Sequence, residues 1–321
     1  MVRLGVLLAA AILMISVVGA ANAKMAMQTF PVLAGAGPHD VYPASDGTVW
    51  FTAQSAGKLG RLDPKTGKSE LIALGPAAAP HGVIVGPDGA AWVTEGGQNA
   101  IARVDPATRA VKLFSLPDQQ RNANLNTATF DHQGLLWFTG QNGIYGRLDP
   151  KAGQVTVFGA PRGTGPYGIA TTPDGQVFFA SLAGNYLGQI DLKSSTVTVL
   201  DPPVPRQGAR RVWSDSHGGL WVTGWNSGDL LRYDSKTRTW AHWHLPGDAP
   251  QPYAVYVDET DAVWVSDWGA NAILRFDPKT EKFETFPLPD RYASVRQLAG
   301  RKGEVWGAES AADKLLVLQT E

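Results

Sequence analysis

The sequence predicts an all-β protein, a seven-bladed β-propeller with four-stranded antiparallel blades. Two observations predict it: one motif recurs along the chain, and the N-terminal segment can supply a strand that the last repeat lacks. Roughly every 42 to 45 residues, an apolar segment ends in an aromatic residue followed by small or β-branched residues. A repeat of this length cannot bury its own hydrophobic face, so seven copies must pack together in a closed ring. The copies are Trp50–Thr52, Trp92–Thr94, Trp137–Thr139, Phe178–Ala180, Trp221–Thr223, Trp264–Ser266 and Trp306–Ala308.

The second repeat shows the four expected strands in order. An innermost strand at 80–85 leads through the turn Gly86–Gly89 to a second strand at 90–94. A third strand at 100–104 leads through a turn at 105–108 to an outer strand at 111–116. The inner strands are apolar runs because neighbouring blades cover both of their faces, whereas the outer strand alternates more loosely.

The last repeat lacks an outer strand, and the N-terminal segment can supply it. The first six repeats each end in an outer-strand segment, but the seventh ends near Leu318 without one. The segment Met27–Leu33 is similar to the outer strands of the other repeats. We therefore expect Gln28–Leu33 to pair with Leu315–Leu318 and to remove the exposed sheet edges of the last blade.

An aspartate recurs in the turn before the outer strand of six repeats. A calcium site in every repeat is one interpretation of this spacing. We favour a structural role, because Asp accepts hydrogen bonds from nearby backbone N–H groups and a following Pro fixes the next φ. The six residues are Asp63, Asp105, Asp149, Asp191, Asp234 and Asp277.

Residues 1–23 predict a cleaved signal peptide, which leaves 24–321 as a single propeller domain. Arg3 supplies a positive charge, Leu4–Gly19 is an apolar run, and Ala21–Ala23 is a small-residue cleavage signature. An uncleaved anchor is the alternative, although the run is short for a membrane span of about 20 residues. No cysteine follows the cleavage site, which excludes a lipoprotein. We expect a periplasmic or secreted monomer without stable membrane insertion after cleavage.

The composition restricts the possible partners. The 28 basic and 29 acidic residues give a formal charge of −1, so nothing favours nucleic acid or acidic lipid. The chain has no cysteine, but a domain of about 300 residues can bury most of its surface without disulfides. Histidines and carboxylates are the available chemistry, and a small molecule is the expected ligand.

Polar side chains gather where the innermost strands begin. The position eleven residues before each signature aromatic should face the ring axis, and the position three residues after it should lie at the same mouth. Such a group of titratable and aromatic side chains is typical of a binding site, although any open funnel collects polar residues. The first set is His39, His81, Asn126, Tyr167, Arg210, Tyr253 and Val295 with its neighbour Arg296. The second set is Ala53, Glu95, Gly140, Ser181, Gly224, Asp267 and Glu309, and Trp225 and Trp268 follow two of them. The remaining histidines, His132, His217, His242 and His244, lie in turns or an outer strand, where solvated or packing roles are expected.

Several of these segments resemble the streptogramin B lyases, also called virginiamycin B lyases. The strings are Pro80–Val83, Gly86–Gly89, Trp92–Glu95 and Gly60–Asp63, and Trp264–Ile273 resembles the same blade motif with Asp267 in place of the glutamate. The resemblance extends over all seven repeats. It implies a lyase that opens a lactone or cyclic depsipeptide ester by Mg²⁺-assisted elimination, with a possible role in antibiotic resistance.

The resemblance also implies roles for individual residues. His81 would be the general base, His39 a substrate contact, and Glu95 a Mg²⁺ ligand, with Asp267 or Glu309 as possible additional ligands. A neutral histidine is a competent base near pH 7. Tyr167, Arg210, Tyr253, Arg296, Trp225 and Trp268 would complete the substrate-binding surface.

Two departures from the family pattern keep other functions open. Ala79 occupies the position of a second carboxylate, and the histidine pair lies in the first two blades. One alternative is a propeller lactonase, similar to the gluconolactonases, with a calcium ion on oxygens from Glu95, Asn126 and Asp267 or Glu309. The other is a non-catalytic periplasmic binding or scaffold propeller.

Overall fold

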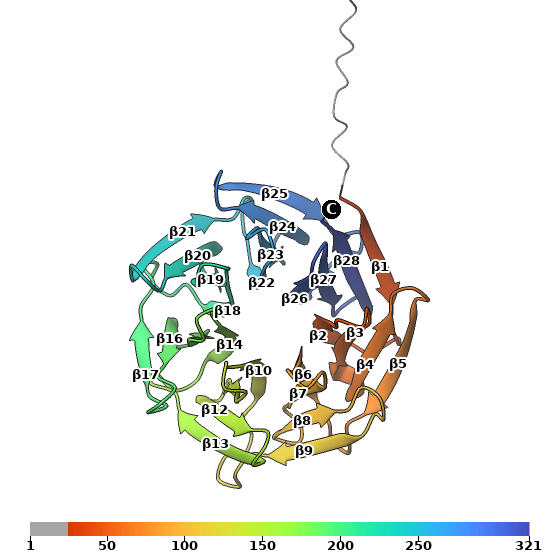
Figure 1. Ribbon diagram of the computed structural model, residues 1–321. Helices are drawn as coiled ribbons and strands as arrows, with labels where there is room; N and C mark the ends of the chain where they lie inside the picture. Colours follow the sequence, from red (N-terminus) through yellow and green to blue (C-terminus); the bar gives the residue numbers. More distant parts are fainter. Residues whose placement is uncertain (1–24, 321) are drawn as a thin grey trace, which may run out of the picture.

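The protein is a ring of seven four-stranded antiparallel sheets in a computed structural model that describes residues 25–320 (Figure 1). Blade 1 comprises β2 (Pro38–Pro43), β3 (Val49–Ala53), β4 (Lys58–Asp63) and β5 (Lys68–Ala73), with a short 3₁₀ helix η1 (Gln54–Ala56). Blade 2 comprises β6 (Pro80–Val85), β7 (Ala91–Glu95), β8 (Ala100–Val104) and β9 (Val111–Ser115). Blade 3 comprises β10 (Leu125–Phe130), β11 (Leu136–Gly140), β12 (Ile144–Asp149) and β13 (Gln154–Gly159).

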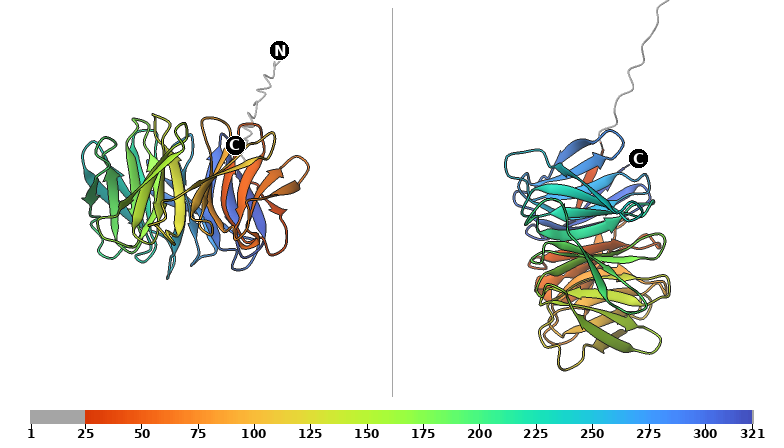
Figure 2. Two further views of the ribbon diagram at one scale, coloured as in Figure 1. Left: turned by 90° about the horizontal axis from the view of Figure 1, so that it is seen from below. Right: turned by 90° about the vertical axis from the view of Figure 1, so that its left-hand side faces the viewer.

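Blades 4 to 7 repeat this order from the axis outwards. Blade 4 comprises β14 (Pro166–Thr171), β15 (Val177–Ser181), β16 (Tyr186–Ile190) and β17 (Val197–Leu200). Blade 5 comprises β18 (Ala209–Ser214), β19 (Gly219–Gly224), β20 (Asp229–Asp234) and β21 (Thr239–His244). Blade 6 comprises β22 (Pro252–Val257), β23 (Val263–Asp267), β24 (Ala272–Asp277) and β25 (Lys282–Pro287). Blade 7 comprises β26 (Val295–Arg301), β27 (Glu304–Glu309), β28 (Lys314–Gln319) and the N-terminal β1 (Met27–Pro31). Seen from the side, the ring is a short disc (Figure 2).

The predicted closure of the ring by the N-terminal strand is confirmed. Strand β1 pairs antiparallel with β28, with Met27 opposite Leu318 and Pro31 opposite Lys314 (Figure 1). The Phe30 ring is buried and stacks on Trp306 with 5.5 Å between ring centroids. The first described strand thus completes the last blade with both hydrogen bonds and apolar contact.

The signature aromatics form the core between blades. Trp137, Trp221 and Trp264 are at most 1% exposed, and each donates its indole N–H to an aspartate in the preceding turn. A buried indole N–H needs such an acceptor, because leaving it without one would forfeit its hydrogen bond to water. These turn aspartates therefore stabilise the core by accepting hydrogen bonds from its buried indoles.

The other recurring aspartates are turn residues, as predicted. The carboxylates of Asp105, Asp149, Asp191 and Asp234 each accept N–H groups from two residues that follow in the turn. Those hydrogen bonds lower the pKa of Asp105 and Asp191, because they stabilise the charged form. The spacing therefore reflects turn geometry.

A β-bulge at the start of every innermost strand sets the direction of the axial side chains. In blade 1, Pro38 pairs with Ala53 and Val41 with Phe51, so His39 and Asp40 both lie opposite the single residue Thr52. All seven blades show the same register shift. A bulge locally breaks the strict alternation of side chains, so each blade can direct two consecutive residues toward the axis.

The residue opposite each bulge ties neighbouring blades together. Thr52 accepts the Asp40 N–H and donates its hydroxyl to the His81 carbonyl of the next blade. Thr94, Thr139, Thr223 and Ser266 form the corresponding bonds in blades 2, 3, 5 and 6. Blades 4 and 7 have Ala180 and Ala308 at this position and lack the hydroxyl.

Replacing Thr223 by valine should therefore destabilise the ring. The change keeps the side-chain shape but leaves the Arg211 N–H and the Tyr253 carbonyl without their partner. We expect the free energy of unfolding to fall by about 1 to 3 kcal/mol, measured by urea denaturation. Thr239→Val, on the exposed part of β21, should change it little. Equal effects of the two variants would contradict the tying role.

Across residues 25–320, the structure contains no helix with the length and apolarity that crossing a membrane requires. The predicted signal peptide, residues 1–23, lies outside the described residues.

Candidate functional site

The predicted axial residues meet in one cluster. The rings of His39 and His81 lie 3.8 Å apart, centroid to centroid, and Asn126 Nδ2 lies 3.1 Å from His81 Nε2. Across the axis, the hydroxyls of Tyr167 and Tyr253 are hydrogen-bonded to each other. Residues from neighbouring and opposite blades thus contact one another at the level where the innermost strands begin.

In blade 7 the axial residue is Arg296. Val295 pairs with Glu309 and Leu298 with Gly307, so the bulge consists of Arg296 and Gln297. The eleven-residue spacing points to Val295 instead, because Arg296 precedes Trp306 by ten residues, one fewer than the eleven that separate His39 from Trp50. The neighbour Arg296 therefore occupies the position that His39 has in blade 1.

Asp40 orients His39. His39 Nδ1 lies 2.8 Å from Asp40 Oδ1, and both side chains are almost fully buried. A carboxylate only accepts, so Nδ1 carries the proton and Nε2 keeps its lone pair. Among the described residues, Asp40 is the one carboxylate that directly contacts the histidine pair.

His81 differs from His39 in whether its Nε2 lone pair is engaged in a hydrogen bond. Thr127 Oγ1 accepts from Arg211 and donates to Asn126 Oδ1, so the amide Nδ2 of Asn126 faces His81 and donates to Nε2. The lone pair of His81 Nε2 is therefore engaged. Its Nδ1 is buried and has no hydrogen-bond partner among the described residues.

Burial and surrounding arginines keep both histidines neutral. Burial lowers the pKa of His39 well below 6.5, and Arg211, Arg296 and Arg210 lower it further. Burial and the neighbouring His39 lower the pKa of His81 well below 6.5, although Asp40 acts in the opposite direction. Both rings are uncharged at neutral pH, as a general base must be before it accepts a proton.

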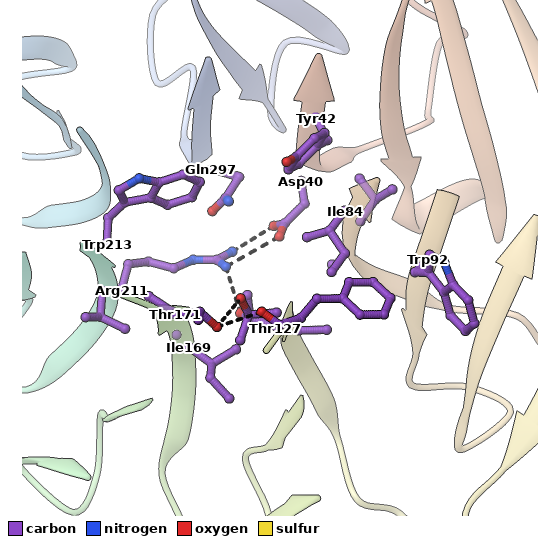
Figure 3. Close-up of a pocket in the computed structure, with 18 of the residues that line it drawn as sticks. Asp40, Tyr42, Ile84, Trp92, Thr127, Ile169, Thr171, Arg211, Trp213 and Gln297 are labelled. Atoms are coloured by element: carbon purple, nitrogen blue, oxygen red, sulfur yellow. Dashed lines mark hydrogen bonds and ion pairs between the residues drawn. The ribbon is translucent and has the colours of Figure 1, made fainter. Parts of the chain in front are cut away.

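A buried ion pair spans the axis below the histidines. Arg211 Nη2 lies 2.7 Å from Asp40 Oδ1, and Arg211 Nη1 donates to Thr127 at 2.9 Å (Figure 3). We call Asp40, Thr127 and Arg211 the crossbar. All three are second residues of bulges. The sequence pattern placed only the first residue of each bulge on the axis. The polar residues that directly follow His39, Asn126 and Arg210 could have identified the second residue.

The predicted substrate contacts form an aromatic cluster around two arginines. The Arg210 guanidinium lies 3.6 Å from the Tyr253 ring centroid and 4.6 Å from that of Trp225. Trp268 stacks on Tyr253 at 4.9 Å, and Arg296 lies 5.0 Å from the Trp268 ring. Arg210 also donates to the Tyr167 hydroxyl at 3.1 Å. These contacts fill the axial mouth with planar side chains.

Two of the three predicted carboxylate ligands accept hydrogen bonds from backbone N–H groups. Glu95 Oε1 accepts the N–H groups of Ala79 and Gly97, and Asp267 Oδ1 accepts those of Gln251 and Gly269. Each holds the loop that enters its own blade. The second oxygens, Glu95 Oε2 and Asp267 Oδ2, are buried and have no partner among the described residues.

These donors fit a Mg²⁺ ion poorly. Mg²⁺ prefers several hard oxygen ligands in octahedral geometry. Within residues 25–320, the one group of three ligand side chains whose atoms converge is His39, Asp40 and His81, and its only carboxylate is already paired with Arg211. Glu95 offers one free oxygen, and Ala79, at the position of the family's second carboxylate, has no side-chain oxygen.

Glu309 is a buried carboxyl without a partner. Both oxygens lack hydrogen bonds among the described residues, and burial together with Asp290 raises its pKa to about 7, against the opposing effect of Lys314. The folded pKa exceeds the unfolded value of 4.5, so stability should be complete below pH 4.5 and decrease as pH rises through 7.

We therefore expect Glu309→Gln to stabilise the protein at pH 8.5 by about 1 to 3 kcal/mol and to change little at pH 5. Denaturant unfolding of both proteins at the two pH values measures this. Glu284→Gln, on the exposed face of β25, is the matched control. A variant that is no more stable than the parent at pH 8.5 would show that the ionised Glu309 carboxylate does not destabilise the folded protein.

Comparison with known proteins identifies the family. The model of the virginiamycin B lyase family matches residues 11–242 and 75–320. The chain belongs to the virginiamycin B lyase family. No curated protein sequence gives a match.

Solved structures of this family share the fold. Virginiamycin B lyase from Staphylococcus aureus superposes with a TM-score of 0.85 at 22% identity, over 92% of this chain and 99% of that one. A streptogramin B lyase gives 0.83 at 24% identity, over 92% and 98%. The extracellular domain of a hybrid two-component system from B. thetaiotaomicron gives 0.73 at 18% identity, over 92% of this chain and 43% of that one. The propeller fold is therefore shared by the two lyases and by an extracellular domain of a two-component system.

Proposed function

We propose that this protein is a carbon–oxygen lyase that opens a lactone or cyclic depsipeptide at its ester bond, with an axial histidine as the general base. The observation that carries the proposal is the pair of neutral histidines in ring contact, one of them oriented by a carboxylate, in a member of the virginiamycin B lyase family. A neutral imidazole with a free lone pair can remove a proton α to a carbonyl.

The hydrogen bonds favour His39 in the role that the sequence resemblance gave to His81. His39 Nε2 keeps a free lone pair because Nδ1 donates to Asp40, whereas the His81 Nε2 lone pair accepts from Asn126. In the proposed step the α proton moves to His39. Its bonding electrons form the carbon–carbon double bond, and the ester oxygen leaves the β carbon as a carboxylate.

Two neighbouring arginines could stabilise the negative charge that develops in this step. Arg210 and Arg296 lie on the aromatic rings across the axis, where charge-assisted hydrogen bonds could hold a substrate carbonyl or the departing carboxylate. His81, next to His39, would contact the substrate. Mg²⁺ remains a prediction from the resemblance, and no step here depends on it.

A binding-only propeller is the second candidate, because the axial side chains are satisfied by one another. The Tyr167–Tyr253 bond, the Asn126–His81 bond and the stacked Arg210 fill the mouth without a ligand. Catalysis then requires these aromatic side chains to rearrange when a substrate enters. A pure binding protein requires no proton transfer.

Turnover with product analysis tests the proposal. The purified protein is incubated with a quinupristin-like depsipeptide and with simple lactones, with Mg²⁺ and with a chelator, and the products are analysed by mass spectrometry. Elimination gives a ring-opened product with the mass of the substrate, whereas hydrolysis adds one water. No product from any substrate would favour the binding-only candidate, and loss of activity with chelator would support the metal.

We also propose that the chain is exported and cleaved before Lys24, since residues 1–23 have the pattern of a secretory signal. The similarity to extracellular domains of the same fold agrees with this. N-terminal sequencing of the protein from the periplasm or medium should begin at Lys24. A membrane-bound product that begins at Met1 would contradict it.

A further inference from the structure

A cavity lies on the ring axis beyond the crossbar. Its volume is about 410 Å³, within the range of small-molecule sites. It is lined by residues further along the innermost strands, such as Thr127–Phe130 and Arg211–Ser214, and by none of the first bulge residues such as His39, His81 or Tyr253 (Figure 3). The crossbar therefore separates this cavity from the histidine cluster.

One part of the cavity wall is apolar. Ile84, Phe130, Ile169, Trp213 and Tyr42 line it. Three of these are aromatic rings that a planar ligand can pack against. Figure 3 shows Tyr42, Ile84, Ile169 and Trp213 around the space next to the crossbar. The hydroxyls of Thr129 and Thr171 are already bonded, to each other and to the Phe130 carbonyl. An apolar ligand body therefore fits this part of the cavity.

The polar groups gather at one end. Arg211 is 3% exposed and directs its two Nη groups at Asp40 and Thr127, while its Nε has no partner among the described residues. The Gln297 amide lies on the same wall, between Trp213 and Asp40 (Figure 3). A hydrogen-bond acceptor on a ligand can meet the Arg211 and Gln297 donors at this end.

The electrostatic balance favours an anion. Arg210, Arg211 and Arg296 surround the axis, and Asp40 is the one carboxylate paired with any of them among the described residues. Burial alone would raise the pKa of Tyr253, but Arg210 and Arg211 outweigh it and lower that pKa. The field that acts on Tyr253 is therefore positive, and Arg211, paired with Asp40, is the cation that also lines the cavity. Charges are weakly screened in such a partly desolvated space.

We propose that this far cavity binds a small monocarboxylate with an aromatic or branched apolar body. The carboxylate lies at the Arg211–Gln297 end, and the body packs between Ile84, Phe130, Ile169 and Trp213. This site is separate from the proposed catalytic cluster and does not depend on lyase activity.

Calorimetric titration with three isosteric probes tests the assignment. We use 3-phenylpropanoate, its neutral amide and the corresponding propylammonium. We expect the carboxylate to bind roughly tenfold or more tightly than the amide, and the ammonium not to bind, since a charge-assisted hydrogen bond to Arg211 is lost. Equal affinity for the three probes, or no binding of the carboxylate, would overturn the proposal.

Variants locate the binding. Ile84→Trp adds bulk to the cavity wall and should abolish binding, and Gln297→Leu should weaken carboxylate binding at least severalfold while preserving volume. Trp225→Phe, in the aromatic cluster on the other side of the crossbar, should leave the affinity unchanged, because Trp225 does not line the cavity. Circular dichroism confirms that each variant folds. Unchanged affinity in both folded cavity variants, Ile84→Trp and Gln297→Leu, would place the probe elsewhere and refute the site.

Discussion

Replacing His39 by alanine should lower kcat by roughly 10²- to 10⁴-fold, the range for loss of a positioned general base. The free Nε2 lone pair and the Nδ1–H bond to Asp40 give His39 the geometry of a base. Replacing His81, whose Nε2 accepts from Asn126, should instead act mainly on KM, because contacts of equal strength in ground and transition states change binding only. Steady-state kinetics on the ester substrate separates the two.

The reverse pattern, with the kcat effect in His81→Ala, would return the base to the residue that the family motif indicates. A pH profile adds a readout that a structural role would not change. Because burial holds the pKa of His39 well below 6.5, kcat/KM should stay flat from pH 8 to below pH 6.5 and fall only when the ring is protonated. An inflection above pH 7 would contradict this assignment.

Deleting residues 24–34 should have the largest effect on stability. The deletion removes all of β1, the five pairings with β28 and the buried Phe30, and it exposes the β28 edge to other molecules. Loss of a buried phenylalanine alone costs about 3 to 5 kcal/mol, so we expect a large drop in Tm and aggregation. Thermal unfolding and size-exclusion chromatography measure both effects.

Single substitutions separate the two contributions. Phe30→Ala should reproduce a good part of the loss, whereas Gln28→Ala on the same strand should change little, because Gln28 is exposed. A deletion variant with unchanged Tm and solubility would show that β1 is dispensable for closing the ring.

The repeat made the architecture predictable, because each blade must bury its apolar strands against the next. The signature tryptophans and the missing outer strand identified the blade number and the closing segment. The axial ring was predictable for the same reason, since every innermost strand begins at an equivalent position.

The interactions within the site were less predictable. A bulge changes which residues face the axis, and its second member is set by hydrogen bonds to Thr52 and its equivalents, which no strand periodicity reveals. Asp40 and Arg211 lie 171 positions apart in sequence and meet only because the ring is closed. The bond of Glu95 to its own blade's entry loop likewise depends on the folded loop.

The hydroxyl ties between blades are unevenly distributed, and this gives the ring one weak joint. Ala180 leaves the joint from blade 4 to blade 5 without this hydroxyl, whereas at the joint from blade 7 to blade 1 the Ser310 hydroxyl donates to the Pro38 carbonyl. Local opening is easiest where fewest bonds must break. The disc should therefore open first between blades 4 and 5, so that Arg210 moves away from the Tyr167 hydroxyl when an axial ligand enters.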